Sequence, residues 1–346
     1  MDLTLLLYAT GAFLISLLTQ YLVIDLSHKR GIFIDDHTSD LPQKLHSEPT
    51  PRIGGLGIFI ACVFMTKEVL GETLGLRIIL CLIPAFLAGF LEDLFAKISP
   101  LRRLLIMSIS ALMAIYLLDA VVTDFGFIHV PYGVGVFITL IAFLGLINGT
   151  NLIDGFNGLS SGVCFLIFSA YFVISLRLND MTMAYISLVC MGAILGFLLF
   201  NFPLGKIFLG DGGAYSLGFM LAVLSILIVR RHPEVSPWFA LVCLIYPVWE
   251  VIFSFSRRMI IHRLSPLHPD SKHVHQLIYR NITRQNNPMT SLLIFPFILL
   301  FNALAVWFYD SSLALFLIAV GFTSSYTLFY YIYSRKEMRS GATKNA

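Results

Sequence analysis

Charged residues are scarce in this sequence. Lys, Arg, Asp and Glu make up 12% of its 346 residues, about half of the roughly 25% typical of soluble domains. Apolar residues account for 58%, and the mean hydropathy is +0.84. Because so few charges cannot cover a surface that faces water, the composition excludes a soluble globular protein. It predicts an all-α integral membrane protein.

The sequence also has few cysteines and a small net charge. The five cysteines lie singly inside apolar runs, without the C-x-x-C spacing of a metal site or the clustering of a disulfide framework. A net charge of +3 leaves no basic footprint for a nucleic-acid partner. The chain also lacks a convincing internal repeat, which many secondary transporters have.

Long apolar runs fill most of the chain. A spanning helix needs roughly 20 mostly apolar residues, and charge clusters with Pro and Gly breaks divide the sequence into about eleven such segments. Their expected limits are 3–25, 53–70, 76–92, 101–119, 134–150, 159–177, 183–200, 213–229, 237–256, 290–308 and 312–334. The first has no basic n-region, so we expect a membrane helix rather than a cleaved signal. The sequence thus predicts one polytopic domain over residues 1–346.

The distribution of Lys and Arg sets the expected orientation. Eighteen of the 23 lie in alternate loops and at the C-terminus, and five lie in the loops of the other side. Because positive charges favour the cytoplasmic side, we expect the N-terminus outside and the C-terminus in the cytoplasm. The active-site loops expected on the cytoplasmic face are 27–52, 92–103, 148–158, 201–213 and 257–289.

Glu92 and Asp93 end one apolar segment. Adjacent carboxylates repel each other, and a helix C-terminus disfavours negative charge. One interpretation is that Lys97, Arg102 or Arg103 balances them as ordinary interfacial charges. The other is that they bind Mg²⁺ or accept a proton, since hard cations take carboxylate oxygens.

Asn151, Asp154 and Asn157 are spaced three residues apart, which would place them on one face of a helix. The glycines around them weaken a helix and allow a ligand to approach the backbone. The alternative is a turn in which Asn and Asp act as caps. A stretch this polar, without Lys or Arg, favours a binding site.

Asp211 lies in a Gly-Asp-Gly-Gly stretch directly before an apolar segment. It could be the N-cap of that helix. Glycines beside a helix N-terminus also suit phosphate binding through backbone N–H groups. The two interpretations are compatible.

Three histidines and a lysine gather in the last polar loop, at His268, Lys272, His273 and His275. A zinc site would need more regular ligand spacing, and no cysteine contributes. The remaining alternatives are solvated side chains or groups that bind an anionic substrate. Together, the polar loops offer carboxylates for a divalent cation, glycine-lined turns for phosphates and basic groups for further negative charge, which metal-assisted phosphoryl transfer needs. Because the loops lie at the bilayer surface, one substrate could be a lipid.

In order and spacing, these motifs resemble those of the polyprenyl-phosphate N-acetylhexosamine-1-phosphate transferases. The resemblance covers residues 46–276 and begins with His-Ser-Glu-Pro-Thr-Pro-Arg-Ile-Gly-Gly at 46–55. The Pro-Thr-Pro-Arg form is most similar to the bacterial undecaprenyl-phosphate N-acetylglucosaminyl-1-phosphate transferase branch. The phospho-N-acetylmuramoyl-pentapeptide transferases usually have Pro-Thr-Met-Gly-Gly there.

The resemblance implies a reaction between undecaprenyl phosphate and a UDP-N-acetylhexosamine such as UDP-GlcNAc. A phosphate oxygen of the lipid attacks the sugar-linked phosphorus, UMP leaves, and the lipid-linked sugar starts a cell-envelope polysaccharide such as lipopolysaccharide O-antigen. It also implies Mg²⁺ as cofactor, with Mn²⁺ as the alternative, and a cytoplasm-facing site in the bacterial inner membrane. A homodimer is compatible with it.

The family's site residues carry over by motif. Asp93 matches the acidic residue proposed to deprotonate the lipid phosphate, Asp154 an acidic residue of the Asn-x-x-Asp loop, and Asp211 a ligand of the catalytic Mg²⁺. Asp93 and Glu92 are expected as further metal ligands. Phe208 matches a ring that stacks on uracil, and the histidines match a loop that binds the diphosphate and sugar. The residues expected to bind substrate are Arg52, Asn151, Asn157, Asn201, Phe208, Lys272, His273 and His275.

The sequence departs from the family pattern at two acidic positions. The family usually has Asp-Asp where this chain has Glu92-Asp93, and Asp where it has Asn157. Because Asn157 lacks a charge, a non-catalytic binder of lipid-linked sugars remains an alternative. A transporter or flippase, and a phospho-N-acetylmuramoyl-pentapeptide transferase, are further alternatives.

Overall fold

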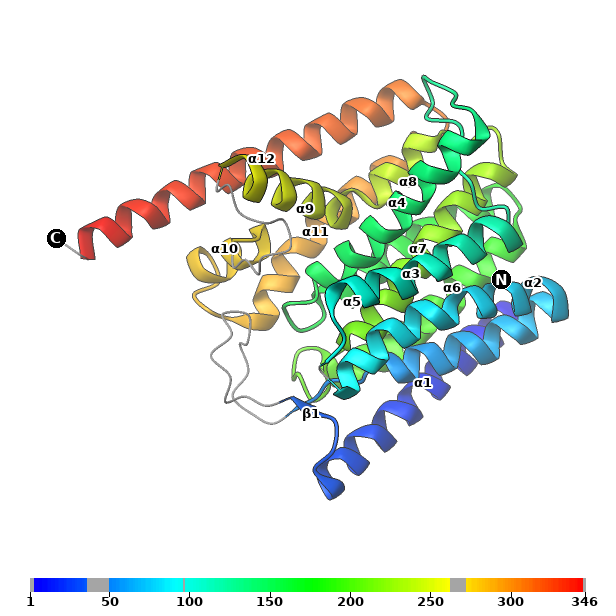
Figure 1. Cartoon of the computed structure of the whole chain (residues 1–346), viewed down its shortest axis with the longest axis horizontal. Helices are drawn as coiled ribbons and strands as arrows, with labels where there is room; N and C mark the ends of the chain where they lie inside the picture. The colour runs from blue at the N-terminus through cyan, green and yellow to red at the C-terminus, as the bar shows by residue number, and fades with distance from the viewer. Residues whose placement is uncertain (1–2, 36–49, 96, 262–271, 345–346) are drawn as a thin grey trace.

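The computed structural model describes residues 3–35, 50–95, 97–261 and 272–344, and these form a bundle of long helices (Figure 1). The helices are α1 (Leu3–Arg30), α2 (Gly55–Phe95), α3 (Pro100–Leu117), α4 (Tyr132–Leu152), α5 (Leu159–Arg177), α6 (Met181–Asn201), α7 (Gly210–Arg231), α8 (Pro237–Cys243), α9 (Ile245–Ser256), the π-helix η1 (Arg257–Ile261), α10 (Val274–Asn281), α11 (Asn287–Trp307) and α12 (Ser312–Lys344). Two short strands, β1 (Ile34–Asp35) and β2 (Thr50–Pro51), pair antiparallel. The all-α prediction is confirmed.

Most of these helices are long and apolar enough to cross a membrane. Within the described ranges nine helices qualify alone, and α8 with the helical run that α9 begins forms a tenth candidate, bent by 75°. The protein is therefore a multi-pass membrane protein. Its side-to-side orientation and its total of eleven spans stay predictions.

Helix α2 is 41 residues long and covers most of two predicted spans, 53–70 and 76–92. A straight helix would separate Gly55 from Gly89 by about 50 Å. Both glycines nevertheless lie against the first turn of α7, and the rings of Phe59 and Phe86 stack with centroids 3.9 Å apart. Helix α2 therefore folds back on itself into two arms, which agrees with the two predicted passes.

Helix α7 forms the centre of the bundle and is buried along nearly its whole length. A helix that is apolar all round is stable only inside other helices or lipid. The two arms of α2 approach its first turn at glycines: a Cβ at Gly55 would lie 2.1 Å from the Gly213 nitrogen, and one at Gly89 would lie 2.2 Å from the Asp211 carbonyl carbon. Because only glycine permits this approach, the start of α7 is held firmly in the bundle.

The two ends of the bundle carry different loops. The β1–β2 ribbon and α10 lie at the left-hand end in Figure 1. That end also has the ends of α2, α4 and α6 and the starts of α3, α5 and α7. The polar stretches picked out by sequence, as far as the structure describes them, therefore belong to one end, as predicted. The opposite end contains the loops 118–131, 178–180, 232–236 and 308–311.

Candidate active site

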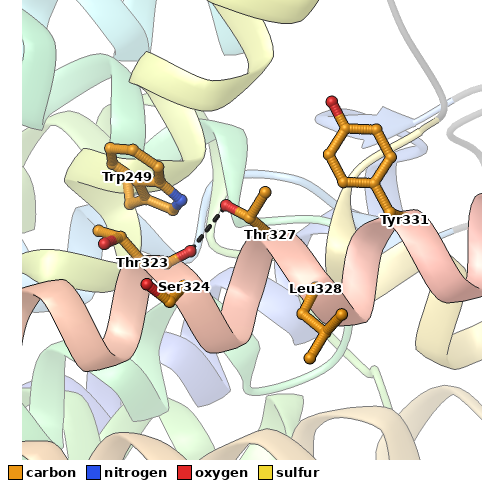
Figure 2. Close-up of a pocket in the computed structure, with 6 residues that line it drawn as sticks. All are labelled: Trp249, Thr323, Ser324, Thr327, Leu328 and Tyr331. Atoms are coloured by element: carbon orange, nitrogen blue, oxygen red, sulfur yellow. Dashed lines mark hydrogen bonds between the residues drawn. The ribbon is translucent and has the colours of Figure 1, made fainter.

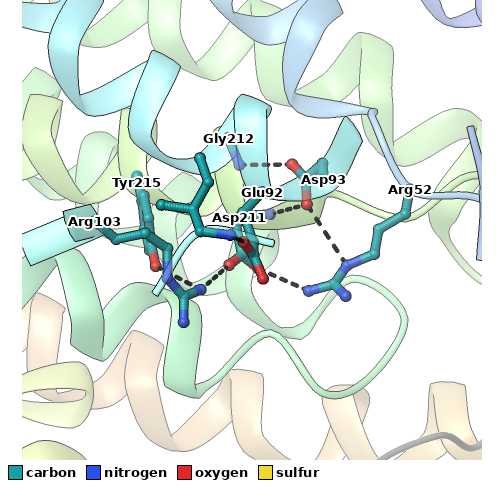
Figure 3. A network of polar contacts seen from close by, with 8 residues as sticks. Arg52, Glu92, Asp93, Arg103, Asp211, Gly212 and Tyr215 are labelled. Atoms are coloured by element: carbon teal, nitrogen blue, oxygen red, sulfur yellow. Dashed lines mark hydrogen bonds and ion pairs between the residues drawn. The ribbon is translucent and has the colours of Figure 1, made fainter. Parts of the chain in front are cut away.

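Asp211 lies in the first turn of α7 and is almost fully buried. Helix α7 begins at Gly210, and Leu209 occupies the N-cap position. The expectation that Asp211 is the N-cap is therefore wrong. Its two carboxylate oxygens instead accept bonds from Arg52 Nη2 and Arg103 Nη1, each at 2.7 Å (Figure 3).

Asp93 binds the start of α7 from the end of α2. Its Oδ1 accepts the Asp211 N–H and its Oδ2 accepts the Gly212 N–H, both at 2.8 Å (Figure 3). These N–H groups have no partner within their own helix, and negative charge is favoured at a helix N-terminus. Arg52 Nε lies 3.7 Å from Asp93 Oδ1. The first turn of α7 and one arginine thus offset part of the cost of burying Asp93.

Glu92 and its basic neighbours are arranged differently from the simple charge balance that sequence allowed. Glu92, in the last turn of α2, accepts the Ile98 N–H on Oε2 at 2.9 Å, from the segment that follows the helix. Arg103 pairs with Asp211, and Arg52 faces Asp93. The metal role of Glu92 stays a prediction.

Arg52 reaches the site through backbone pairing between two distant segments. The Phe208 N–H donates to the Pro51 carbonyl at 2.8 Å, and the Gly54 N–H donates to the Phe208 carbonyl at 2.9 Å. Gly210 has a φ of 76°, and a Cβ there would lie 2.4 Å from the Arg52 carbonyl oxygen. Glycine is therefore required where the two segments meet. The half-buried ring of Phe208 lies beside the site, and its stacking on uracil stays a prediction.

Asp154 occupies the turn 153–158 between α4 and α5. Burial raises the pKa of Asp154 to about 7; the positive charge of Arg52 opposes this shift, and the negative charge of Asp211 adds to it. Among the described residues, no side chain or backbone group donates a hydrogen bond to its carboxylate. A carboxyl group with a pKa near neutrality and no fixed partner suits a proton acceptor.

The amide residues of this region connect loops. Asn201 Oδ1 accepts the Gly158 N–H at 2.6 Å, and Asn201 Nδ2 donates to the Ile207 carbonyl at 2.8 Å. Asn157 Nδ2 donates to the Pro203 carbonyl at 3.0 Å. Helix α4 ends at Leu152 and α5 begins at Leu159, so Asp154 and Asn157 lie in a turn and the shared helical face is wrong. The caps are Ile153 and Gly158, so the Asn and Asp residues do not act as the expected caps. Substrate binding by Asn151, Asn157 and Asn201 stays a prediction.

His273 and His275 are buried, which rules out the interpretation of these two as solvated loop histidines. His273 Nδ1 lies 2.7 Å from Glu250 Oε1, and His275 Nδ1 lies 3.2 Å from the Tyr246 hydroxyl. Burial lowers the pKa of His275 to about 3, although the charge of Glu250 opposes this shift. Lys272 is exposed, and His268, like residues 46–49 of the first motif, lies outside the described residues.

Sequence reasoning treated Arg103 only as a counterion and missed it as a site residue. Arg103 Nη1 also lies 3.4 Å from the Tyr215 hydroxyl, and its buried Nε has no hydrogen-bond partner in the part of the chain that the structure describes. The available signal was its position, ten residues after Asp93 and in the first turn of the next helix at the same end of the bundle.

The residues fit Mg²⁺ only if substrate supplies part of its shell. Within the described part of the chain, no three His, Cys, Asp or Glu side chains gather as a metal site. The oxygens of Asp93 receive backbone N–H groups, and those of Asp211 receive arginine. Mg²⁺ is commonly held by one or two carboxylates together with substrate phosphates. The donor set therefore suits a cation shared between Asp211 and phosphate groups.

An open groove of about 430 Å³ lies between α9 and α12, away from these carboxylates. It is lined by Trp249, Thr323, Ser324, Thr327, Leu328 and Tyr331 (Figure 2). The Thr327 hydroxyl donates to the Thr323 carbonyl of its own helix (Figure 2). None of the residues expected to bind substrate lines this groove.

Comparisons with known proteins identify similar chains. The family model described as glycosyl transferase family 4 matches residues 76–229. The undecaprenyl-phosphate alpha-N-acetylglucosaminyl 1-phosphate transferase of Thermotoga maritima is 31% identical over 288 residues, covering 82% of this chain and 84% of that protein. A probable undecaprenyl-phosphate N-acetylglucosaminyl 1-phosphate transferase of Bacillus subtilis is 29% identical over 76% of this chain and 75% of its own length. A phospho-N-acetylmuramoyl-pentapeptide-transferase of Caldanaerobacter subterraneus is 26% identical over 65% of this chain and 76% of its own length.

Proposed function

The chain belongs to glycosyl transferase family 4, and on that premise we propose that it transfers N-acetylhexosamine-1-phosphate from a UDP-sugar to undecaprenyl phosphate. One observation carries the proposal: buried Asp211 lies between two arginines at the end of a membrane-spanning bundle, with Asp93 and Asp154 beside it. This arrangement can receive two phosphate-bearing substrates, one of which is a lipid.

The reaction exchanges one phosphorus–oxygen bond for another. An oxygen of the lipid phosphate bonds to the sugar-linked phosphorus, and the bond from that phosphorus to the bridging oxygen breaks. UMP leaves with the electron pair of the broken bond. Arg52 and Arg103 are suited to bind and orient the phosphate groups, because guanidinium groups match phosphate oxygens in geometry and charge.

Asp154 is the proton acceptor in this proposal. Its pKa of about 7 lets it take the remaining proton of the lipid phosphate near neutral pH. The resemblance assigned this role to Asp93. Both Asp93 oxygens, however, accept backbone N–H groups of α7, and this supports a role in holding Asp211 in place.

Mg²⁺ is the proposed cofactor. Asp211 would hold it, with Asp93 and Glu92 as the further ligands that sequence predicts, and Mn²⁺ remains the alternative. When bound, the cation would neutralise phosphate oxygens in the transition state. The protein's own contribution is to keep Asp211 buried, oriented by the start of α7 and flanked by two arginines.

The proposed location is the bacterial inner membrane, with the site facing the cytoplasm and the product starting a cell-envelope polysaccharide. The excess of Lys and Arg on the loops at this end supports that orientation. UDP-GlcNAc is the proposed donor, because the Pro-Thr-Pro-Arg motif and the names of the T. maritima and B. subtilis relatives agree on it.

Purified protein in detergent, incubated with Mg²⁺, undecaprenyl phosphate and a panel of UDP-sugars, tests the proposal. We expect release of UMP and formation of undecaprenyl-diphospho-GlcNAc, detected by mass spectrometry. Activity only with UDP-N-acetylmuramoyl-pentapeptide would favour the muramoyl branch instead. Binding of the lipid-linked sugar without release of UMP from any donor would favour a non-catalytic binder.

A further inference from the structure

Glu250 is a buried carboxylate inside the α8–α9 helix pair, and the proposed reaction does not use it. Its side chain is 1% exposed. Oε1 contacts His273 Nδ1 at 2.7 Å, and Oε2 accepts the Tyr326 hydroxyl of α12 at 2.6 Å. Ionisable groups within membrane segments are costly and usually functional. A buried ion pair is also weak evidence for stability, so its position needs another reason.

The histidine that Glu250 contacts belongs to a pair that reaches the active site. The rings of His273 and His275 are stacked, with centroids 5.3 Å apart and an angle of 7° between their planes. The Tyr246 hydroxyl contacts His275 Nδ1 at 3.2 Å. His275 in turn packs edge-on against Phe156 at 5.6 Å, and a Cβ at Gly155 would lie 3.8 Å from its Nε2. His275 therefore supports the residues that directly follow Asp154.

The turn that carries Asp154 is held differently in its two halves. Its second half is fixed by hydrogen bonds: Asn157 N–H donates to Asn287 Oδ1, Gly158 N–H donates to Asn201 Oδ1, and Ser291 donates to the Asn157 carbonyl. In its first half the Asp154 N–H donates to the Asn151 carbonyl at 3.0 Å, and the side-chain support comes from Phe156, whose ring packs between His275 and Tyr279. The orientation of the His275 ring thus influences where Asp154 lies.

We propose that Glu250 and Tyr326 are positioning residues that hold the Asp154 turn in place through His273 and His275. This inference rests on the proposed function, because Asp154 is its point of action. A carboxylate only accepts hydrogen bonds, so the hydrogen of His273 lies on Nδ1, and the carboxylate fixes both the tautomer and the ring orientation. The last helix, α12, is thereby connected to the catalytic turn.

The kinetic test compares Glu250→Gln and Tyr326→Phe with Tyr331→Phe, which removes a hydroxyl from an exposed ring on the same helix. Loss of supporting hydrogen-bond partners typically costs about 10–100-fold in activity. We expect kcat to fall about tenfold or more in Glu250→Gln and less in Tyr326→Phe. KM for both substrates should stay within about twofold, because the residues that bind them are unchanged. Tyr331→Phe should match the wild type.

A double-mutant cycle makes the inference specific to Asp154. In an Asp154→Asn background, Glu250→Gln should cause no further loss of kcat, because the two changes affect one unit. Additive losses would overturn the proposal. A rise in donor KM with kcat unchanged would also overturn it, because the histidines would then contact the donor directly.

A spectroscopic measurement separates this inference from the proposed function. With ¹⁵N-labelled histidine, and the His273 signal assigned through His273→Gln, wild-type protein should show hydrogen on Nδ1, and Glu250→Gln should lose that signature. If Glu250→Gln does not fold, Tyr326→Phe supplies the same comparison as a shift of the signal. A normal His273 signature without any transferase activity would refute the proposed function alone. An unchanged signature in both variants would refute the positioning role of Glu250 and Tyr326.

Discussion

Both ends of the bundle contain aspartates that the fold buries, and the two ends differ in how fully the protein pairs them. At the end opposite the site, Asp180 caps α6, with Oδ1 accepting the Met183 N–H at 3.1 Å, and it contacts Arg231 at 2.6 Å and His232 at 2.9 Å. Burial alone would raise the pKa of Asp180, but the bonds from Arg231 and His232 hold it below its usual value. The protein itself thus supplies this carboxylate with hydrogen-bond donors and a positive charge.

At the site end, acidic groups are brought together without full compensation. Asp154 has a raised pKa and, among the described residues, no hydrogen-bond donor to its carboxylate, while Asp211 lies close enough to add to that shift. A protein stabilised only for folding would pair such groups, as it pairs Asp180. Asp180 therefore has a structural role, whereas the arrangement of Asp154 and Asp211 favours binding of a ligand.

The largest expected effect is that of Asp211→Asn. Removing this charge should lower kcat more than about 1,000-fold, equivalent to about 4 kcal/mol, because both arginines and the proposed cation depend on it. UMP release measures the loss, and thermal unfolding in detergent checks that the protein remains folded. Retention of more than about a tenth of the activity, a barrier change under about 1.4 kcal/mol, would contradict the assignment.

Asp154→Asn should have the next largest effect, lowering kcat about 100-fold, as expected for loss of a general base. The wild-type rate should rise as pH increases through about 7, because Asp154 can accept a proton only after losing its own. In Asp154→Asn this acid limb should disappear from the pH profile of kcat/KM. A wild-type profile that is flat between pH 6 and pH 8 would exclude Asp154 as the base.

Phe208→Ala tests an uncharged residue at the same end and should have a smaller effect. We expect KM to rise about tenfold, near 1.4 kcal/mol, for every UDP-sugar alike, because stacking on uracil is independent of the sugar. Competition by UMP should weaken in parallel. A change in the ranking of donor sugars would show that Phe208 contacts the sugar instead.

Asp180→Asn should have the smallest effect on catalysis and leave kcat within about twofold. It should instead lower stability by about 1–3 kcal/mol, since Arg231 loses its partner. Because the folded pKa of Asp180 lies below 3.8, its contribution is present at neutral pH and is lost as pH falls through the folded value. Thermal unfolding at pH 7 and at acidic pH measures both parts. A large loss of kcat without a loss of stability would remove the contrast between the two ends.

Sequence patterns predicted the helices and the gathering of polar stretches at one end because each depends on local composition. Apolar runs predicted the long helices, including both arms of α2, and the order of the loops predicted that Asp93, Asp154 and Asp211 lie at one end. The hydrogen-bond partners of each carboxylate could not be predicted from the sequence. Asp93 bonds the backbone of residues more than 100 positions later, and Arg103 selects Asp211 over its near neighbour Glu92. The burial of His273 and His275 likewise depends on α9 and α12, which no spacing within their own loop encodes.

The connection between Asp93 and α7 also has a consequence for the order of synthesis. The acceptor in α2 leaves the ribosome 118 residues before its donor at Asp211. Until α7 is synthesised, the Asp93 carboxylate at the end of α2 lacks the two backbone N–H donors that bind it in the complete bundle. The central helix of the bundle is therefore made after both arms of α2, and a nascent chain that stops before residue 211 carries an acceptor without its partner. The partners of the Asp154 turn at His275, Asn287 and Ser291 follow later still, so the catalytic centre is completed only after the central helix is in place.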